Sequence, residues 1–424
     1  MGEDARAPMP LTLLRSALFL ATALLGVPSA RALIIYGTGP SDVNNALNTT
    51  APASGAPWLN VLQFGGNNAT GIYLGNGCIL TANHVAPVPG SITINGLLYT
   101  MDPDFAPLQI TEPPDVVDMK LVKILGIPDG LGNRVLPALP VVQKLPINFS
   151  ATTDLSRNCT IIGWGVGKGT IIPNQGWNWG DNSTRAQRWG TNRTLSTAVS
   201  AVYDGYSYEA LQTSFRRSLG SNDTSEITLG DSGSALFQKP GTVWQLSGLT
   251  TSALQYLSNA AQYDGVLDDP LNTDIPNPTL GDQPDAADFV RLEKYAHLLR
   301  YENWANLKFG SSTTVTTADT DKDGSNNLLE YAFHTEPGIA SVSALPRVGV
   351  ESGYVTLTYT QLMSATDLSY VVQESPSLSP PNWTPATVVE ETVSTSGVTR
   401  VVKAKVALAG ATQKYLRLSV TKVP

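Results

Sequence analysis

Short apolar runs that end in glycine, proline or asparagine turns constrain the fold of this chain more than any other feature of its sequence. They recur between residues 33 and 267, for example at 71–74, 91–94 and 160–164. Many short runs with turn signals between them are typical of the strands of a sandwich or barrel. The sequence therefore predicts a mainly β fold for its first two thirds.

The length of the chain and the pattern after residue 267 predict further units. At 424 residues the chain exceeds one ordinary domain. Apolar residues at three- and four-residue spacing over 286–304 predict an amphipathic helix. Alternation over 348–420 then predicts a second, smaller β domain. The formal net charge of −8 argues against the backbone of a nucleic acid as the main partner.

The first 32 residues have the pattern of an export signal. A mildly positive start is followed by an apolar run over 17–27 and by Ala-Arg-Ala at 30–32. The run is shorter than the roughly 20 residues that span a bilayer. We therefore expect cleavage after Ala32 and a mature chain that is secreted or held at the cell surface or in the periplasm. No second apolar stretch is long enough to anchor it, so no membrane span is expected after cleavage.

Three separated residues have the chemistry of a nucleophile, its base and an orienting acid. Ser232 lies between glycines, which let the backbone turn sharply and aim its N–H groups at a developing oxyanion. A serine hydroxyl needs a neighbouring base. Of the three histidines, His84 ends an apolar run, whereas His297 falls in the predicted helix and His334 follows an acidic motif. Asp118 opens an alternating run and could orient an imidazole. Taken singly, each of the three also fits an ordinary loop or core position.

Six segments together resemble the chymotrypsin/trypsin family, in family order. They are Thr-Ala-Asn-His-Val (81–85), Asp-Met-Lys-Leu-Val-Lys-Ile (118–124), Cys-Thr-Ile-Ile-Gly-Trp-Gly (159–165), Gly-Asp-Ser-Gly-Ser (230–234), Ser-Gly-Leu-Thr-Thr (247–251) and the apolar helix pattern that ends near Trp304. Any one of these could be an accident, but the ordered set is specific.

The resemblance implies a fold, a reaction and a site. It implies a double six-stranded β-barrel of the chymotrypsin type, with a catalytic triad of His84, Asp118 and Ser232 between the barrels. The N–H groups of Gly230 and Ser232 would form the oxyanion hole. The implied activity is that of a trypsin-like serine endopeptidase that acts on proteins or peptides. We expect a monomer.

Three further roles follow from the same resemblance. Asp231 would pair with a new amino terminus, which signal cleavage would create at Leu33. Glu226 lies six residues before Ser232, where trypsin-like enzymes keep a substrate-binding acid, although a solvated loop glutamate is the interpretation that we favour. Thr251 falls on the substrate-binding strand.

The sequence also departs from the family. Val85 replaces the cysteine that usually follows the histidine, and Ser234 replaces a glycine after the nucleophile. Cys78 has no obvious family counterpart, and the usual partner of Cys159 is missing. Whether Cys78 and Cys159 pair or stay buried thiols, the sequence does not decide.

A twelve-residue acidic motif over 319–330 predicts a calcium site. Carboxylates at its positions 1, 3 and 5, glycine at 6 and glutamate at 12 match an EF-hand loop. It looks like the single calcium loops that join modules in secreted bacterial proteins. The expected Ca²⁺ ligands, of which Ser325 would use its carbonyl, are Asp319, Asp321, Asp323, Ser325, Asn327 and Glu330.

The predicted organisation is a signal peptide (1–32), a protease domain (33–308), a linker with the calcium loop (309–342) and a small β-sandwich-like domain (343–424). Two alternatives stay open: a catalytically inactive binding protein on a protease scaffold, and a surface adhesin that uses the C-terminal domain.

Overall fold

The structure is a computed structural model, and it describes residues 33–37, 45–65, 69–131, 133–139, 147, 154–172, 176–215, 224–254, 266–268, 286–311, 315–411 and 413–423. The predicted signal peptide lies outside these residues. Within them, no helix is long and apolar enough to cross a membrane.

Twelve strands form one hydrogen-bonded sheet, and they fall into two groups along the chain. The first group is β2 (Val61–Phe64), β3 (Ala69–Gly75), β4 (Cys78–Thr81), β7 (Leu108–Glu112) and β8 (Asp115–Lys123). The second group is β11 (Asn158–Gly163), β14 (Arg188–Arg193), β15 (Val199–Tyr203), β16 (Tyr206–Ser214), β18 (Ala235–Gln238), β19 (Gln245–Leu254) and β21 (Ala286–Arg291). A single registered pair, Ser207 of β16 with Val116 of β8, joins the groups. The predicted mainly β fold is confirmed. The twelve strands of the large sheet fall into groups of five and seven.

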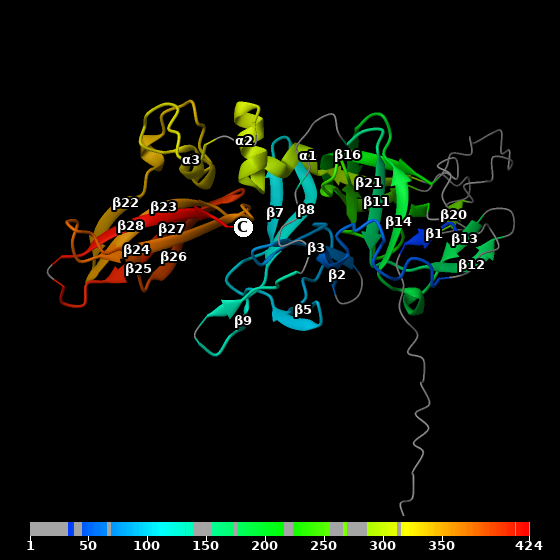
Figure 1. The fold of residues 1–424 in the computed structure, drawn as a ribbon, viewed down its shortest axis with the longest axis horizontal. Helices are drawn as coiled ribbons and strands as arrows, with labels where there is room; N and C mark the ends of the chain where they lie inside the picture. Colours follow the sequence, from blue (N-terminus) through cyan, green and yellow to red (C-terminus); the bar gives the residue numbers. More distant parts are fainter. Residues whose placement is uncertain are drawn as a thin grey trace, which may run out of the picture.

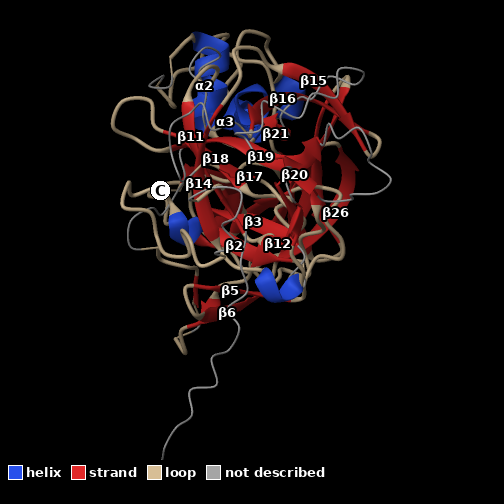
Figure 2. Ribbon diagram, turned by 90° about the vertical axis from the view of Figure 1, so that its right-hand side faces the viewer, coloured by secondary structure: helices blue, strands red, loops and turns tan. Residues whose placement is uncertain are grey.

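Small sheets and short helices complete this part of the chain, and strands dominate the molecule (Figure 2). The small sheets are β1 (Ile34–Ile35) with β17 (Ser225–Glu226), β5 (Ser91–Ile94) with β6 (Leu97–Thr100), β9 (Ile127–Pro128) with β10 (Arg134–Val135), and β12 (Lys168–Ile172), β13 (Gly176–Trp179) and β20 (Val266–Asp268). Among the described residues, the 3₁₀ helices are η1 (Trp58–Asn60), η2 (Asn182–Thr184), η4 (Ala296–Leu298) and η5 (Val342–Ala344).

The amphipathic helix expected over 286–304 was wrong in its first third. Residues 286–291 form β21, which pairs with both β16 and β19 and is buried along its whole length. Helix begins only afterwards, with α1 (Leu292–Tyr295), η4 and α2 (Tyr301–Phe309). A strand buried on both faces has no polar face to reveal its period of two, so apolar spacing alone did not distinguish it from a helix.

The C-terminal domain is a two-sheet sandwich, as predicted. One sheet contains β22 (Arg347–Glu351), β23 (Tyr354–Leu362), β27 (Thr399–Ala407) and β26 (Val389–Ser396), and the other contains β25 (Thr384–Pro385), β24 (Leu368–Ser375) and β28 (Tyr415–Lys422). Alternation along β27 turns Val402, Ala404 and Val406 inward, where they pack with Val372 of the other sheet.

The sandwich packs directly on the large β unit, beside α2 (Figure 1). The backbone N and the Oγ1 of Thr366 both donate to the carbonyl of Leu299 at 2.8 Å. The carboxylate of Asp367 accepts a hydrogen bond from the backbone N of Tyr301 at 3.0 Å. One hydrophobic cluster runs from the first strand group through α2 to the loop before β24, so the two β units share a core.

The segment expected to be a linker contributes to the same core. Helix α3 (Asn327–Phe333) follows the acidic loop, and the ring of Tyr331 lies 5.7 Å from that of Trp304 and 5.8 Å from that of Tyr301. The acidic loop is therefore adjacent to a packed joint between the two β units.

Candidate active site

Two neighbouring strands bring His84 and Asp118 together. His84 follows the end of β4, and Asp118 lies within β8, the antiparallel partner of β4. The Asp118 side chain is fully buried, and its Oδ2 lies 2.7 Å from Nδ1 of His84. Its Oδ1 accepts a hydrogen bond from the backbone N of His84 at 2.9 Å. Both carboxylate oxygens therefore hold the same residue, which fixes the position of the imidazole.

Ser232 contacts the other nitrogen of the same imidazole. Its Oγ lies 2.8 Å from Nε2 of His84, although 148 residues separate the two in the chain. The carbonyl of Ser232 accepts a hydrogen bond from the N–H of Thr70, on β3. Gly233 has a φ of +85°, and a Cβ at this position would lie 2.1 Å from the carbonyl oxygen of Thr70. The turn after Ser232 therefore sits tightly against the first strand group, and the three residues form one continuous hydrogen-bonded chain.

Some backbone N–H groups around Ser232 donate hydrogen bonds within the protein, and others have no acceptor among the described residues. The N–H of Gly233 donates to Thr250 at 2.8 Å, and that of Ser234 donates to Asp231 at 2.7 Å. No hydrogen bond to another described residue uses the N–H groups of Gly230 and Ser232. These are the two amides that the sequence analysis expected to form an oxyanion hole.

A buried arginine that the sequence analysis missed lies against Gly230. Gly230 has a φ of +93°, and a Cβ built on it would lie 1.7 Å from Nη1 of Arg185. Nη1 donates to the carbonyl of Trp164 at 3.2 Å, and Nη2 donates to Asn182 at 2.9 Å. Burial lowers the pKa of the guanidinium, and the charge of Asp231 opposes that shift. The positive φ favours glycine at this position, and any side chain there would also displace the guanidinium of Arg185.

Asp231 is buried among donors of its own domain. Its Oδ1 accepts hydrogen bonds from the N–H of Gly165 at 2.7 Å and from the hydroxyl of Ser234, and its Oδ2 accepts them from the N–H and the hydroxyl of Thr228. Burial raises the pKa of this carboxyl, and the hydrogen bonds lower it. The pairing of Asp231 with a new amino terminus stays a prediction, and the occupied state of both oxygens counts against it.

Lys120 holds the loop that carries His84, a role that the sequence did not reveal. It is buried on β8, and its Nζ donates to the carbonyl of Asn83 at 3.1 Å and to that of Val85. Burial lowers the pKa of the ammonium, whereas Asp118 raises it. Because these two carbonyls flank His84, Lys120 fixes the backbone on both sides of the imidazole.

The hairpin between β15 and β16 covers the same histidine. The ring of Tyr203 lies 5.4 Å from that of His84 in an edge-to-face arrangement, at 73°. The hydroxyl of Tyr206 accepts a hydrogen bond from the side chain of Asn83 at 3.0 Å. Asp204 and Gly205 both have positive φ, and Asp-Gly is a strong sequence signal for such a turn. The turn could have been found from sequence, but its position over His84 could not.

Neither residue expected to bind substrate faces open space. Glu226 is fully buried on β17, where it is paired with Ile34 of β1, so the solvated loop position that we favoured for it is wrong. The hydroxyl of Thr251 accepts a hydrogen bond from Tyr208 at 2.7 Å and donates to the carbonyl of Asp288. Both roles stay predictions, and the burial of the two side chains counts against them.

The acidic loop has the features of a cation site. Carboxylate oxygens of Asp319, Asp321 and Asp323 lie within 4.8 Å of one another. Glu330 is fully buried, and among the described residues neither of its oxygens has a hydrogen-bond partner. Burial, followed by the charge of the nearby aspartates, raises the pKa of Glu330 to about 7. A buried carboxylate without donors is costly unless a cation accompanies it, so the residues present fit a divalent metal.

The other two expected calcium ligands, Ser325 and Asn327, make hydrogen bonds to the protein. Ser325 is buried, and its backbone N donates to Asp323 at 2.7 Å. The side-chain amide of Asn327 donates to the carbonyl of Val315 at 2.9 Å, and its oxygen lies 3.5 Å from the hydroxyl of Thr320. The contacts of Asn327 thus tie the loop to the preceding segment.

The question of the cysteines is answered: Cys78 and Cys159 are both buried and unpaired. Burial raises the pKa of each thiol.

No protein-family model matches the chain, and no curated protein sequence matches it. Among solved structures, neuropsin, a serine protease expressed in the limbic system of mouse brain, is 15% identical over 58% of this chain and 94% of its own, with a TM-score of 0.36. The NS6 protease from murine norovirus 1 is 14% identical over 57% of this chain and 93% of its own, with a TM-score of 0.30. Because both TM-scores are low, the interpretation of the site depends on its own geometry.

Proposed function

We propose that the chain is an exported serine endopeptidase with Ser232 as its nucleophile. The observation that carries the proposal is the hydrogen-bonded chain from the buried carboxylate of Asp118 through His84 to Ser232, with links of 2.7 and 2.8 Å. Such an arrangement activates a hydroxyl that is otherwise a weak nucleophile.

The geometry supports a definite course for the reaction. Oγ of Ser232 attacks the carbonyl carbon of a peptide bond while Nε2 of His84 takes its proton. Asp118 keeps the other imidazole proton on Nδ1 and stabilises the imidazolium. The N–H groups of Gly230 and Ser232 stabilise the negative charge that develops on the substrate oxygen. His84 then protonates the leaving amine as the C–N bond breaks. Water attacks the acyl-enzyme with His84 again as base, the ester bond to Oγ of Ser232 breaks, and His84 returns the proton to that oxygen.

A structural calcium ion in the 319–330 loop is the second part of the proposal. The carboxylates of Asp319, Asp321, Asp323 and Glu330 would hold it, together with the carbonyl of Ser325. Bound calcium would supply positive charge beside the buried carboxylate of Glu330 and the three half-buried aspartates, and would stiffen the loop that precedes α3. It takes no part in peptide hydrolysis.

Export is the third part. The leader pattern over 1–32 supports cleavage after Ala32, which would leave Leu33 as the first residue of a monomeric, secreted or surface-held enzyme. Mass spectrometry of the amino-terminal peptide of exported protein tests the cleavage site, and an intact 1–32 segment on exported protein would refute it.

The decisive experiment is active-site labelling with a fluorophosphonate probe. Folded, processed protein should be labelled, and Ser232→Ala should not. Ser343→Ala makes the same chemical change at an exposed serine of the C-terminal part and should label like wild type. A digest of a peptide library by wild type and by Ser232→Ala then tests peptide hydrolysis directly.

The other outcomes identify the alternatives. Folded wild-type protein that is neither labelled nor active would leave the inactive scaffold as the better interpretation. Adhesion to a surface that survives both Ser232→Ala and the loss of labelling would indicate that the C-terminal domain makes the functional contact.

A further inference from the structure

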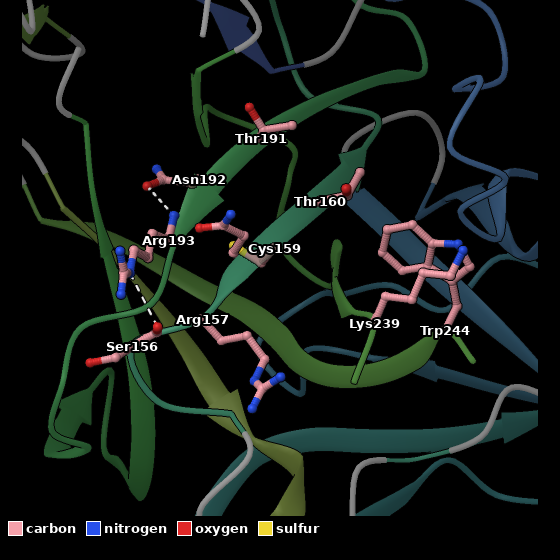
Figure 3. Close-up of a pocket in the computed structure, with 10 residues that line it drawn as sticks. Ser156, Arg157, Cys159, Thr160, Thr191, Asn192, Arg193, Lys239 and Trp244 are labelled. Atoms are coloured by element: carbon pink, nitrogen blue, oxygen red, sulfur yellow. Dashed lines mark hydrogen bonds between the residues drawn. The ribbon is translucent and has the colours of Figure 1, made fainter. Parts of the chain in front are cut away.

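We propose that a basic pocket remote from Ser232 binds an acidic segment of the protein substrates. The pocket has a volume of about 720 Å³ and lies where β11, β14 and the hairpin from β18 to β19 meet (Figure 3). The inference rests on the proposed function, because it supposes that the substrates are proteins.

The charge of this pocket is opposite to that of the molecule. Among the described residues, ten line the pocket, and they include three cations, Arg157, Arg193 and Lys239, and no carboxylate. The chain as a whole has a formal net charge of −8. A local concentration of one sign within a protein of the other sign attracts a ligand of defined charge.

The side chains of two of the three cations, Arg193 and Lys239, are ordered by contacts within the protein. Nε of Arg193 donates to the carbonyl of Ser156 at 3.1 Å. The ammonium of Lys239 lies 5.4 Å from the ring centre of Trp244, and the indole N–H of Trp244 donates to the carbonyl of Ser54. Groups that are already ordered lose less entropy when they bind a ligand.

Arg157 is half-buried and is the third cation of the pocket. Its backbone N donates to Thr194, which fixes the residue. Its buried Nε has no hydrogen-bond partner among the described residues. In Figure 3, Arg157 lies between Arg193 on one side and the pair of Lys239 and Trp244 on the other. Because this Nε is buried, the two Nη groups are the donors of Arg157 that a ligand could reach, and such a pair binds a carboxylate in a two-pronged geometry.

The chemistry favours an acidic peptide over a nucleic acid. Three cations on a protein of net negative charge provide few of the phosphate contacts on which nucleic-acid affinity depends. Two or three carboxylates of one peptide segment would match the three cations, and the ring of Trp244 offers a face for an apolar or aromatic neighbour.

The position of the pocket sets a length requirement on the substrate. Lys239 immediately follows β18, whereas Ser232 lies in the turn before that strand. At about 3.3 Å per residue, the path from Ser232 to Lys239 is on the order of 20 Å. Because the chain turns at Gly233, this path is an upper limit on the direct distance, and about six extended residues between the scissile bond and the acidic segment are enough to span it.

The binding test uses the full mature chain with Ser232→Ala, so that it is independent of catalysis. Fluorescence anisotropy of a labelled peptide of eight alternating Asp and Glu residues should show binding that weakens with added salt. Arg157→Glu or Lys239→Glu should weaken it by about tenfold or more, because each change replaces an attraction with a repulsion. Arg347→Glu makes the same charge change on β22 and should leave the affinity unchanged.

The kinetic test compares substrates. Two long peptides that carry the acidic segment on either side of the cleavage site, and one short peptide without it, are given to the active enzyme. Arg157→Glu should raise KM about tenfold for at least one long peptide and leave the short one unaffected.

The possible outcomes separate the two proposals. No binding of the acidic peptide, or equal binding by the pocket variants, overturns the pocket assignment. Tighter, pocket-dependent binding of a DNA oligonucleotide or a heparin fragment overturns the choice of an acidic peptide. Failure of wild type to cleave any peptide, with pocket-dependent binding intact, refutes the proposed hydrolysis and leaves the acidic-peptide site in place.

Discussion

Asp118→Asn tests the proposed chemistry without changing the size of a side chain. The orientation of the new amide is determined by a group that cannot change its role, the backbone N–H of His84. This N–H donates to Oδ1 of Asp118 at 2.9 Å, so the oxygen of the asparagine must stay there. The reverse orientation would oppose two donors at a buried site and leave both unpaired. The –NH₂ group therefore takes the place of Oδ2, 2.7 Å from Nδ1 of His84.

The consequence is the wrong tautomer. An –NH₂ facing Nδ1 requires Nδ1 to accept, and the imidazole proton must move to Nε2. Nε2 then points its proton at Oγ of Ser232, 2.8 Å away, and cannot take the serine proton. In a serine protease with a Ser-His-Asp triad, the change of the aspartate to asparagine lowers kcat about 10,000-fold. At 1.36 kcal/mol per tenfold, this corresponds to about 5.4 kcal/mol of lost transition-state stabilisation.

The assay is steady-state hydrolysis of a fluorogenic peptide selected from the library digest. Asp118→Asn should lower kcat about 10,000-fold and change KM little, because the groups that bind substrate are untouched. Asp115→Asn is the matched control: it makes the same change on the same strand, at a carboxylate that accepts from Tyr295 rather than from His84. Its kcat should stay within about threefold of wild type.

Thermal unfolding of both variants shows whether the comparison is valid. The substitution removes a buried charge and retains the acceptor for the backbone N–H, so we expect Asp118→Asn to fold. A folded Asp118→Asn enzyme that loses less than about tenfold in kcat would refute the reasoning, because His84 would then not depend on Asp118 for its tautomer.

Three further changes have definite expected outcomes. Gly230→Ala should lower kcat by on the order of 100-fold or more, because the new Cβ overlaps Nη1 of Arg185 at 1.7 Å and displaces the N–H of residue 230, a proposed oxyanion donor. As a control, Gly353→Ala, also at positive φ but with nothing within 4 Å of the new Cβ, should keep the activity of wild type. Removal of calcium by a chelator should lower the melting temperature of wild type by several degrees, since a ligand at 100 times its Kd contributes about 2.7 kcal/mol. Glu330→Gln should have a higher melting temperature than wild type in chelator and a lower one in calcium. Equal effects of calcium on the melting temperatures of the two proteins would exclude calcium from the loop. A thiol reagent should modify neither Cys78 nor Cys159 in folded protein and both after denaturation, because burial raises the pKa of each thiol; labelling of native protein at the denatured rate would contradict this.

Local motifs predicted the residues that the site brings together, since each carries its own short-range signal. Ser232 and Gly230 share one turn, and glycine is needed there for a positive φ that the structure shows. His84 and Asp118 each border or lie within a short apolar strand, and those strands prove to be neighbours in the sheet. The sequence did not encode their contact in any local pattern; the expectation came from the ordered resemblance.

The supporting residues could not be predicted because their roles depend on distant backbone. Lys120 was visible only as an alternating position of a strand, yet it holds two carbonyls of a loop 35 and 37 residues away. Arg185 has no motif, and its importance comes from Gly230, which it meets only in three dimensions. Tyr203 sits on a hairpin that the Asp-Gly turn predicts, but the ring it covers belongs to the other strand group.

The helix–strand error and the unexpected joint between the two β units have one physical cause. A segment that is buried on all sides has few polar residues to reveal whether its period is that of a helix or of a strand. In a segment as short as 286–291, the apolar residues alone do not distinguish the two. Buried residues also show that the two β units are packed against each other and are not separate modules. Arg300 and Asp367 are both buried, one from each β unit, and their opposite charges interact at the joint. The acidic loop enters this joint through Tyr331, which packs on α2, one residue after the buried carboxylate of Glu330. A cation bound at Glu330 would therefore stabilise the packing between the two β units, rather than merely stiffen a tether between independent domains.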